Sequence, residues 1–140
     1  MDRVIIAVGL AAVVVGLAVL YQRRRGNDAP TQRRWAVPDQ LDRDDFESPA
    51  APWLIAIFTS ATCESCAEAM AKAAPLGSPT VAVQEVALDT QRDLHRRYNI
   101  EAVPTLVVAD GEGVVRATFV GPPKADELWA AVAQVKDAGC

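Results

Sequence analysis

The feature that most constrains this chain of 140 residues is an unbroken apolar run near its amino terminus. Residues 4–20 contain only Val, Ile, Ala, Gly and Leu. As a helix that rises about 1.5 Å per residue, this run is roughly 26 Å long, which is just enough to cross the hydrocarbon core of a bilayer. The sequence therefore predicts a membrane anchor over residues 1–22, with one transmembrane helix within residues 4–21.

The residues after this run favour a retained anchor over a cleaved signal peptide. A signal peptide ends its shorter apolar region in small residues of the A-x-A type, whereas Tyr21 and Gln22 are followed here by Arg23–Arg25. Because such cations are enriched on the cytoplasmic side of a membrane helix, we expect a single-pass protein of the cell membrane whose folded part faces the cytoplasm. The alternative is the opposite orientation, with the folded part on the outer side.

The rest of the chain has the composition of one acidic globular domain. Residues 1–34 hold six arginines and two acidic residues, whereas residues 35–140 hold eight Lys or Arg and sixteen Asp or Glu. Phosphate binding needs a basic face, so we do not expect a nucleic-acid partner. About 105 residues suit a single core. We expect a linker and lead-in segment over residues 23–45 and one domain over residues 46–140.

Apolar runs and turn residues predict alternating strands and helices in this domain. The apolar run 53–58, behind Pro52, is typical of a strand that is buried on both faces of a sheet. Further strands are expected at residues 80–88, 105–109 and 114–120, and helices at residues 63–74, 90–98 and 125–136. Because the turn Asp110–Gly113 makes the last two strands antiparallel, the pattern indicates an α/β fold with a central mixed β-sheet flanked by helices.

Two cysteines stand where the first of these helices is expected to begin. Cys63 and Cys66 are separated by Glu64 and Ser65, and Thr62 is the predicted N-cap. At the positive end of the helix dipole, near free backbone N–H groups, Cys63 has a lowered pKa and forms a thiolate near neutral pH. Cys66, one helical turn further, is placed to close a disulfide and to attack a mixed disulfide. The pair predicts thiol–disulfide exchange, with Cys63 as nucleophile and Cys66 as the resolving thiol.

A metal site is the alternative for a C-x-x-C pair, and the sequence disfavours it. Four-ligand zinc sites need a second pair of ligands, and the other candidates are His95 and Cys140. We expect His95 to be exposed on its helix and Cys140 to be an accessory thiol in the tail. No GxGxxG or P-loop motif occurs. The sequence therefore predicts neither a metal nor an organic cofactor.

The order of these motifs resembles that of the thioredoxin family over about residues 50–138. The resemblance is carried by Phe58, Cys63 and Cys66, Val103-Pro104-Thr105, the Gly-containing hairpin and Phe119-Val120-Gly121 before a closing helix. A C-x-x-C alone is a weak signal, but a Val-Pro-Thr about forty residues further on, in front of a hairpin, makes it strong. The resemblance implies a thioredoxin-like fold with a cis peptide bond before Pro104, which faces the cysteines.

The resemblance also implies the partners of the reaction. Protein disulfides or dithiols are the expected substrates, and their binding residues are expected to be Thr62, Val103, Pro104 and Thr105. Val103 would offer backbone hydrogen bonds to an extended substrate. An external electron donor is needed to recycle the cysteine pair. The rival interpretation is a tethered interaction module that has a thioredoxin fold but no catalytic turnover. A third option, which needs the outward orientation, is an oxidant or a reductase of the cytochrome-maturation type.

The sequence departs from the family pattern around the cysteine pair. The family usually has Trp-Cys-Gly-Pro-Cys, whereas this chain has Thr62-Cys63-Glu64-Ser65-Cys66. The buried Asp that the family keeps six residues before the first cysteine is replaced by Ile57, and its Lys partner is matched by Glu85. We expect Glu85 on the surface of a sheet edge, with an inward orientation as the alternative. The negative charge of Glu64 opposes ionisation of the neighbouring thiol, which favours a reductase over a strong oxidant.

Overall fold

The computed structural model describes Met1, residues 12–17 and residues 35–139. The chain divides into two units, residues 1–34 and residues 35–140. In the first unit, residues 12–17 are helical. Among the described residues, no helix is both long and apolar enough to cross a membrane. Most of the predicted transmembrane helix within residues 4–21 lies outside the described residues.

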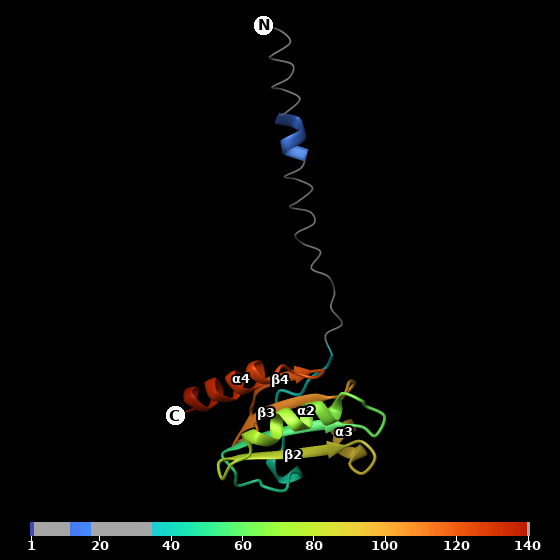
Figure 1. Cartoon of the computed structure of the whole chain (residues 1–140), viewed down its shortest axis with the longest axis vertical. Coiled ribbons are helices and arrows are strands. Elements are labelled where there is room, and N and C mark those ends of the chain that lie inside the picture. Colours follow the sequence, from blue (N-terminus) through green and yellow to red (C-terminus); the bar gives the residue numbers. More distant parts are fainter. Residues whose placement is uncertain (2–11, 18–34, 140) are drawn as a thin grey trace. The chain divides into compact units, whose positions relative to one another are not determined.

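The second unit is built around a mixed sheet of four strands (Figure 1). The strands are β1 (Trp53–Thr59), β2 (Val81–Ala87), β3 (Thr105–Asp110) and β4 (Val115–Val120). Their order in the sheet is β2-β1-β3-β4, in which β1 is parallel to β2 and the other neighbouring pairs are antiparallel. The mixed sheet predicted from the sequence is confirmed, with each strand end within one residue of its predicted position.

Helices cover both faces of this sheet (Figure 1). The α-helices are α2 (Cys66–Ala73), α3 (Arg92–Arg97) and α4 (Ala125–Ala138), and two short 3-10 turns are η1 (Arg43–Asp45) and η2 (Ala74–Leu76). Side chains of α2 and α4 pack on one face, whereas those of α3 and the segment around η1 pack on the other. The predicted arrangement of a sheet flanked by helices is therefore confirmed.

Strand β1 forms the centre of the core because it is buried on both faces. Its side chains alternate between the two faces, as the period of a strand requires. Ile55 and Ile57 pack with residues of α2 and α4, which are Ala69, Ala73, Leu128 and Val132. Leu54 and Phe58 pack with residues from around η1 and from the end of α3, which are Leu41, Phe46 and Tyr98. The apolar residues of this strand therefore contribute to both hydrophobic clusters, one on each face of the sheet.

The segment before β1 is joined to the β3–β4 hairpin by backbone bonds and by one buried arginine. Leu41 N donates to Gly113 O over 2.8 Å, and Val115 N donates to Asp39 O over 3.0 Å. The guanidinium of Arg43, a residue that is 7% exposed, donates to three backbone carbonyls, those of Ser48, Ala51 and Asp110. Hydrogen bonds from a charged donor are stronger than neutral ones, so these three bonds from one buried side chain hold the segment in place.

Candidate active site

Cys63 and Cys66 are joined by a disulfide just beyond the carboxyl end of β1. The two sulfur atoms are 2.09 Å apart and the two Cα atoms are 5.4 Å apart. The loop that carries Cys63 connects β1, which ends at Thr59, to α2, which begins at Cys66. The two thiols that the sequence singled out are therefore close enough to bond, as their spacing predicts.

Helix α2 begins three residues later than the sequence predicts. Cys63 N donates to Ser60 O over 3.2 Å and Cys66 N donates to Cys63 O over 3.4 Å, so that the loop is held by bonds of the turn type. Ala69 N then donates to Ser65 O over 3.1 Å, which is a helical i to i−4 bond. The N-cap is therefore Ser65, and the prediction of Thr62 as N-cap was wrong. Cys63 precedes the helix and does not open it.

The two sulfur-bearing residues differ in exposure. Cys66, in the first turn of α2, is 5% exposed, whereas Cys63 is half-buried. The acidic neighbour Glu64 is exposed, so that water screens its charge. An approaching molecule therefore meets Cys63, and Cys66 lies beneath the surface.

Val103 and Pro104 lie at the same edge of the sheet as the disulfide. Strand β3 is antiparallel to β1, and Thr105 pairs with Phe58 near the carboxyl end of β1. The peptide bond between Val103 and Pro104 is cis, as the resemblance implies. Pro104 O accepts a hydrogen bond from Gly121 N over 2.8 Å, which ties the proline to the end of β4. The fold thus brings together two motifs that are far apart in the sequence.

The residues predicted to bind substrate differ in exposure and in which of their polar groups are still without a hydrogen-bond partner. Thr62 is exposed in the loop, with Oγ1 3.5 Å from Ser60 Oγ. Thr105 is 2% exposed and donates its hydroxyl to Ala102 O over 2.8 Å. Val103 is half-buried, and among the described residues its backbone N–H and C=O have no hydrogen-bond partner. Substrate binding by these residues stays a prediction.

The position of the family's buried Asp is apolar in this protein. Ile57 is fully buried and lies opposite Glu85 in the parallel pairing of β1 with β2. Glu85 is exposed on this edge strand, as the sequence predicts, and its Oε1 accepts a hydrogen bond from Thr59 Oγ1 over 2.6 Å. Sequence reasoning missed Thr59, although its place two residues after Ile57 predicts that it lies on the same face of the strand.

The prediction that His95 is exposed was wrong. His95 is 4% exposed, its Nε2 lies 2.8 Å from Val86 O, and its ring meets Phe58 edge to face. The phase of α3 explains the difference, because Leu94, His95 and Tyr98 occupy the side of the helix that packs on the sheet. His95 therefore has a structural role behind β1. Among the described residues, no group of three or more His, Cys, Asp or Glu side chains is arranged to hold a metal ion.

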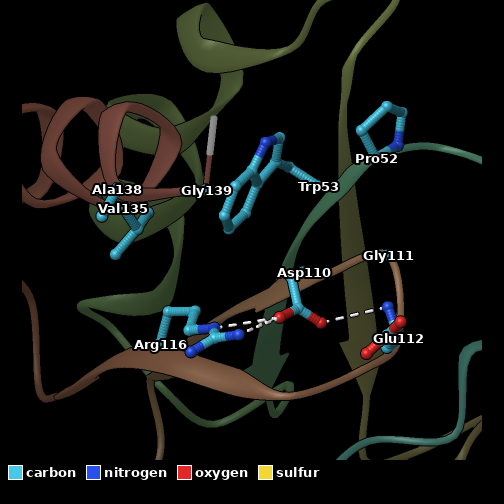
Figure 2. Close-up of a pocket in the computed structure, with 9 residues that line it drawn as sticks. All are labelled: Pro52, Trp53, Asp110, Gly111, Glu112, Arg116, Val135, Ala138 and Gly139. Atoms are coloured by element: carbon cyan, nitrogen blue, oxygen red, sulfur yellow. Dashed lines mark hydrogen bonds and ion pairs between the residues drawn. The ribbon is translucent and has the colours of Figure 1, made fainter.

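One pocket at the sheet lies away from the disulfide. Figure 2 shows this pocket of about 470 Å³, in which the ring of Trp53 faces the end of α4. Trp53 begins β1 and the disulfide follows its end, so a strand of this length puts about 20 Å between them. Burial raises the pKa of Asp110 in the pocket wall, but hydrogen bonds from Arg116 and two backbone N–H groups outweigh it, so this pKa lies below its usual value. Asp110 and Arg116 in this wall are therefore already paired with each other.

The family model of thioredoxin matches residues 41–134. The chain belongs to the thioredoxin family. A search of curated proteins found no match. Thioredoxins combine this fold with a C-x-x-C pair that cycles between dithiol and disulfide. With its joined Cys63 and Cys66, this thioredoxin-family protein is a thiol–disulfide oxidoreductase.

Solved structures of thioredoxins are similar to this thioredoxin-family chain. A variant thioredoxin from Halobacterium salinarum is 26% identical, with a TM-score of 0.53, and the match covers 66% of this chain and 80% of that one. Oxidised mitochondrial thioredoxin 3 from Saccharomyces cerevisiae is 19% identical, with a TM-score of 0.52 and coverage of 60% and 79%. Thioredoxin from Fasciola hepatica is 20% identical, with a TM-score of 0.54 and coverage of 62% and 84%. The last two likenesses show the fold alone.

Proposed function

We propose that this thioredoxin-family protein is tethered to a membrane and exchanges disulfides with protein substrates, with Cys63 as nucleophile and Cys66 as the resolving thiol. The unequal exposure of the two residues carries this proposal, since Cys63 is half-buried and Cys66 is 5% exposed. A bulky protein disulfide has access to the outer sulfur, whereas the inner sulfur needs no access to the substrate. It needs only to reach Cys63, to which it is joined here.

The reaction proceeds by two displacements at sulfur. The thiolate of Cys63 attacks one sulfur of the substrate disulfide, which forms a mixed disulfide and releases the other substrate sulfur as a thiolate. The thiolate of Cys66, once its proton is lost to solvent, then attacks the sulfur of Cys63 and releases the second substrate thiolate. The substrate gains two electrons and the cysteine pair becomes a disulfide. An external dithiol donor returns the pair to its reduced state.

Val103 supports the proposed docking of an extended substrate. Its backbone N–H and C=O have no hydrogen-bond partner among the described residues, and it lies at the edge of the sheet that carries the disulfide. An extended peptide that pairs with these two groups would align its own disulfide with Cys63. Pro104 itself is fully buried, and it acts on that peptide through the neighbouring Val103, to which the cis bond joins it.

Two cysteine variants test the reaction. Cys63→Ser is expected to abolish the reduction of insulin disulfides, whereas Cys66→Ser is expected to accumulate a mixed disulfide with a substrate, visible on a non-reducing gel. A tethered interaction module without turnover predicts a different result, because Cys63→Ser would then keep all partners and the wild type would show no insulin reduction. Retained reduction by Cys63→Ser would contradict the proposal.

The tether and its orientation rest on the sequence alone. The apolar run of residues 4–20 and the arginines that follow it support a single span with the domain on the cytoplasmic side. In the oxidised chain Cys140 is the remaining thiol, since Cys63 and Cys66 are joined. In a Cys63→Ser, Cys66→Ser background, which leaves Cys140 as the one thiol in either redox state, a thiol reagent that cannot cross membranes is expected to label the protein only after lysis, with the further change Cys140→Ser as the unlabelled control. Labelling before lysis would place the domain outside and favour the oxidant or cytochrome-maturation alternative.

A further inference from the structure

The late start of α2 removes part of the stabilisation that the sequence predicts for a Cys63 thiolate. The helix dipole acts on groups within its first turn, and Cys63 lies three residues before the first residue of α2. The N–H of Cys63 is also occupied, because it donates to Ser60 O over 3.2 Å. The charged neighbour Glu64 opposes ionisation, although it is exposed. Another group must therefore help to stabilise the negative sulfur.

The hydroxyl of Ser65 is placed for this role. Ser65 is the N-cap of α2, yet its side chain makes no capping hydrogen bond to the helix. An N-cap serine normally accepts a bond from a backbone N–H of the first turn. Here Ser65 Oγ lies instead 3.8 Å from Cys63 Sγ. A disulfide sulfur carries no proton, so the hydroxyl is the donor in this contact.

Reduction of the disulfide makes this contact stronger. A neutral disulfide sulfur is a weak acceptor, whereas a thiolate carries a full negative charge, and hydrogen bonds to charged groups are stronger than those between neutral groups. Ser65 is half-buried, so the bond is partly protected from water. The charged groups of the first helical turn do not compete, because Glu68 is paired with Lys72 at 2.5 Å.

We propose that Ser65 is a catalytic residue whose hydroxyl donates a hydrogen bond to the Cys63 thiolate and thereby sets how much nucleophile is present near neutral pH. The proposal deepens the proposed function, because it concerns the sulfur that starts the exchange. It also assigns a purpose to the serine that stands where the family usually has proline, since proline has no side-chain donor.

The test isolates the Cys63 thiol in the full-length chain. In a background of Cys66→Ala and Cys140→Ala, the thiolate absorbance is followed against pH, and the rate of alkylation by iodoacetamide is measured near neutral pH. Ser65→Ala is expected to move the titration midpoint up by about one pH unit and to slow alkylation about tenfold. Ser65→Thr, which keeps the hydroxyl, is expected to restore both values. The urea midpoint of unfolding should not change, because the hydroxyl caps nothing.

A matched control removes another hydroxyl from the same loop. Ser60 Oγ lies 3.5 Å from Thr62 Oγ1, and among the described residues it makes no hydrogen bond with Cys63 Sγ. Ser60→Ala is therefore expected to leave the titration unchanged. The proposal is overturned if Ser65→Ala titrates like its parent, or if Ser60→Ala shifts the midpoint as much. No disulfide substrate enters these measurements, so this result is independent of the insulin assay that tests the proposed function.

Discussion

Thr59 donates its hydroxyl to Glu85 Oε1 over 2.6 Å and so links β1 to the edge strand β2. The two partners differ in environment, because Thr59 is 2% exposed whereas Glu85 is exposed. The buried hydroxyl depends on this carboxylate for its hydrogen bond, but the carboxylate also has access to water. Removal of one partner is therefore not equivalent to removal of the other.

We predict that Glu85→Ala destabilises the protein more than Thr59→Val does. Glu85→Ala leaves a buried hydroxyl without an acceptor, which costs about 1–3 kcal/mol, whereas Thr59→Val returns Glu85 to water and costs less than about 1 kcal/mol. Urea unfolding of both single variants and of the double variant measures the difference. The double variant should resemble Thr59→Val. Equal losses in the two single variants would contradict the prediction, and additive losses in the double variant would show that the pair contributes nothing specific.

The turn between β3 and β4 allows a comparison of two glycines. Gly113 has a φ of +82°, and a Cβ at this position would lie 1.9 Å from Leu41 O. Gly111 has no positive φ. The nearest atom to a Cβ added at Gly111 would be Pro52 O, at 3.5 Å. We predict that Gly113→Ala costs about 3 kcal/mol or more, whereas Gly111→Ala stays within about 1 kcal/mol. Thermal and urea unfolding compare the two. A small loss in Gly113→Ala would mean that the segment around Leu41 separates easily from the hairpin.

Arg43 is expected to contribute more to stability than an exposed arginine. Burial lowers the pKa of its guanidinium, and Asp110 partly opposes this effect. We predict that Arg43→Met costs about 3 kcal/mol, because the carbonyl of Ala51 loses its donor and those of Ser48 and Asp110 each lose one of their two donors. The control Arg96→Met removes an exposed pair with Asp93 and should cost less than about 0.5 kcal/mol. If both variants unfold at the same urea concentration, water has replaced the guanidinium as the donor to the carbonyls of Ser48, Ala51 and Asp110.

Tyr98 is expected to ionise only in strong alkali. Burial, followed by the hydrogen bond to Asp45, raises the pKa of Tyr98 to about 12. A phenol that ionises near pH 10 when unfolded and near 12 when folded stabilises the fold fully below pH 10, and this contribution is lost as the pH rises from 10 to 12. The phenolate absorbance difference between wild type and Tyr98→Phe measures this titration. A midpoint near 10 would mean that neither the burial of the phenol nor its contact with Asp45 persists in solution.

Much of the fold was predictable because its signals are local. The apolar run from Trp53 to Phe58 and the turn Asp110–Gly113 each lie within one short segment. The run predicts a buried strand and the turn residues predict a hairpin without reference to the rest of the chain. The C-x-x-C spacing is also local, which is why a bond between Cys63 and Cys66 was foreseeable. Helix boundaries were less predictable. The choice between a turn bond and a helical bond at Cys63 depends on how the loop leaves β1.

The sequence by itself determined which segments become strands and helices and which two sulfurs are close enough to bond, because these properties depend on neighbours a few residues apart. Only the tertiary structure decided that His95 is buried, that Thr59 meets Glu85 and that the hydroxyl of Ser65 turns to Cys63 and not to its own helix. Each of these outcomes depends on the phase of a helix or the register of two strands. Those quantities are determined by packing between segments that are distant in the chain, and no local pattern encodes them.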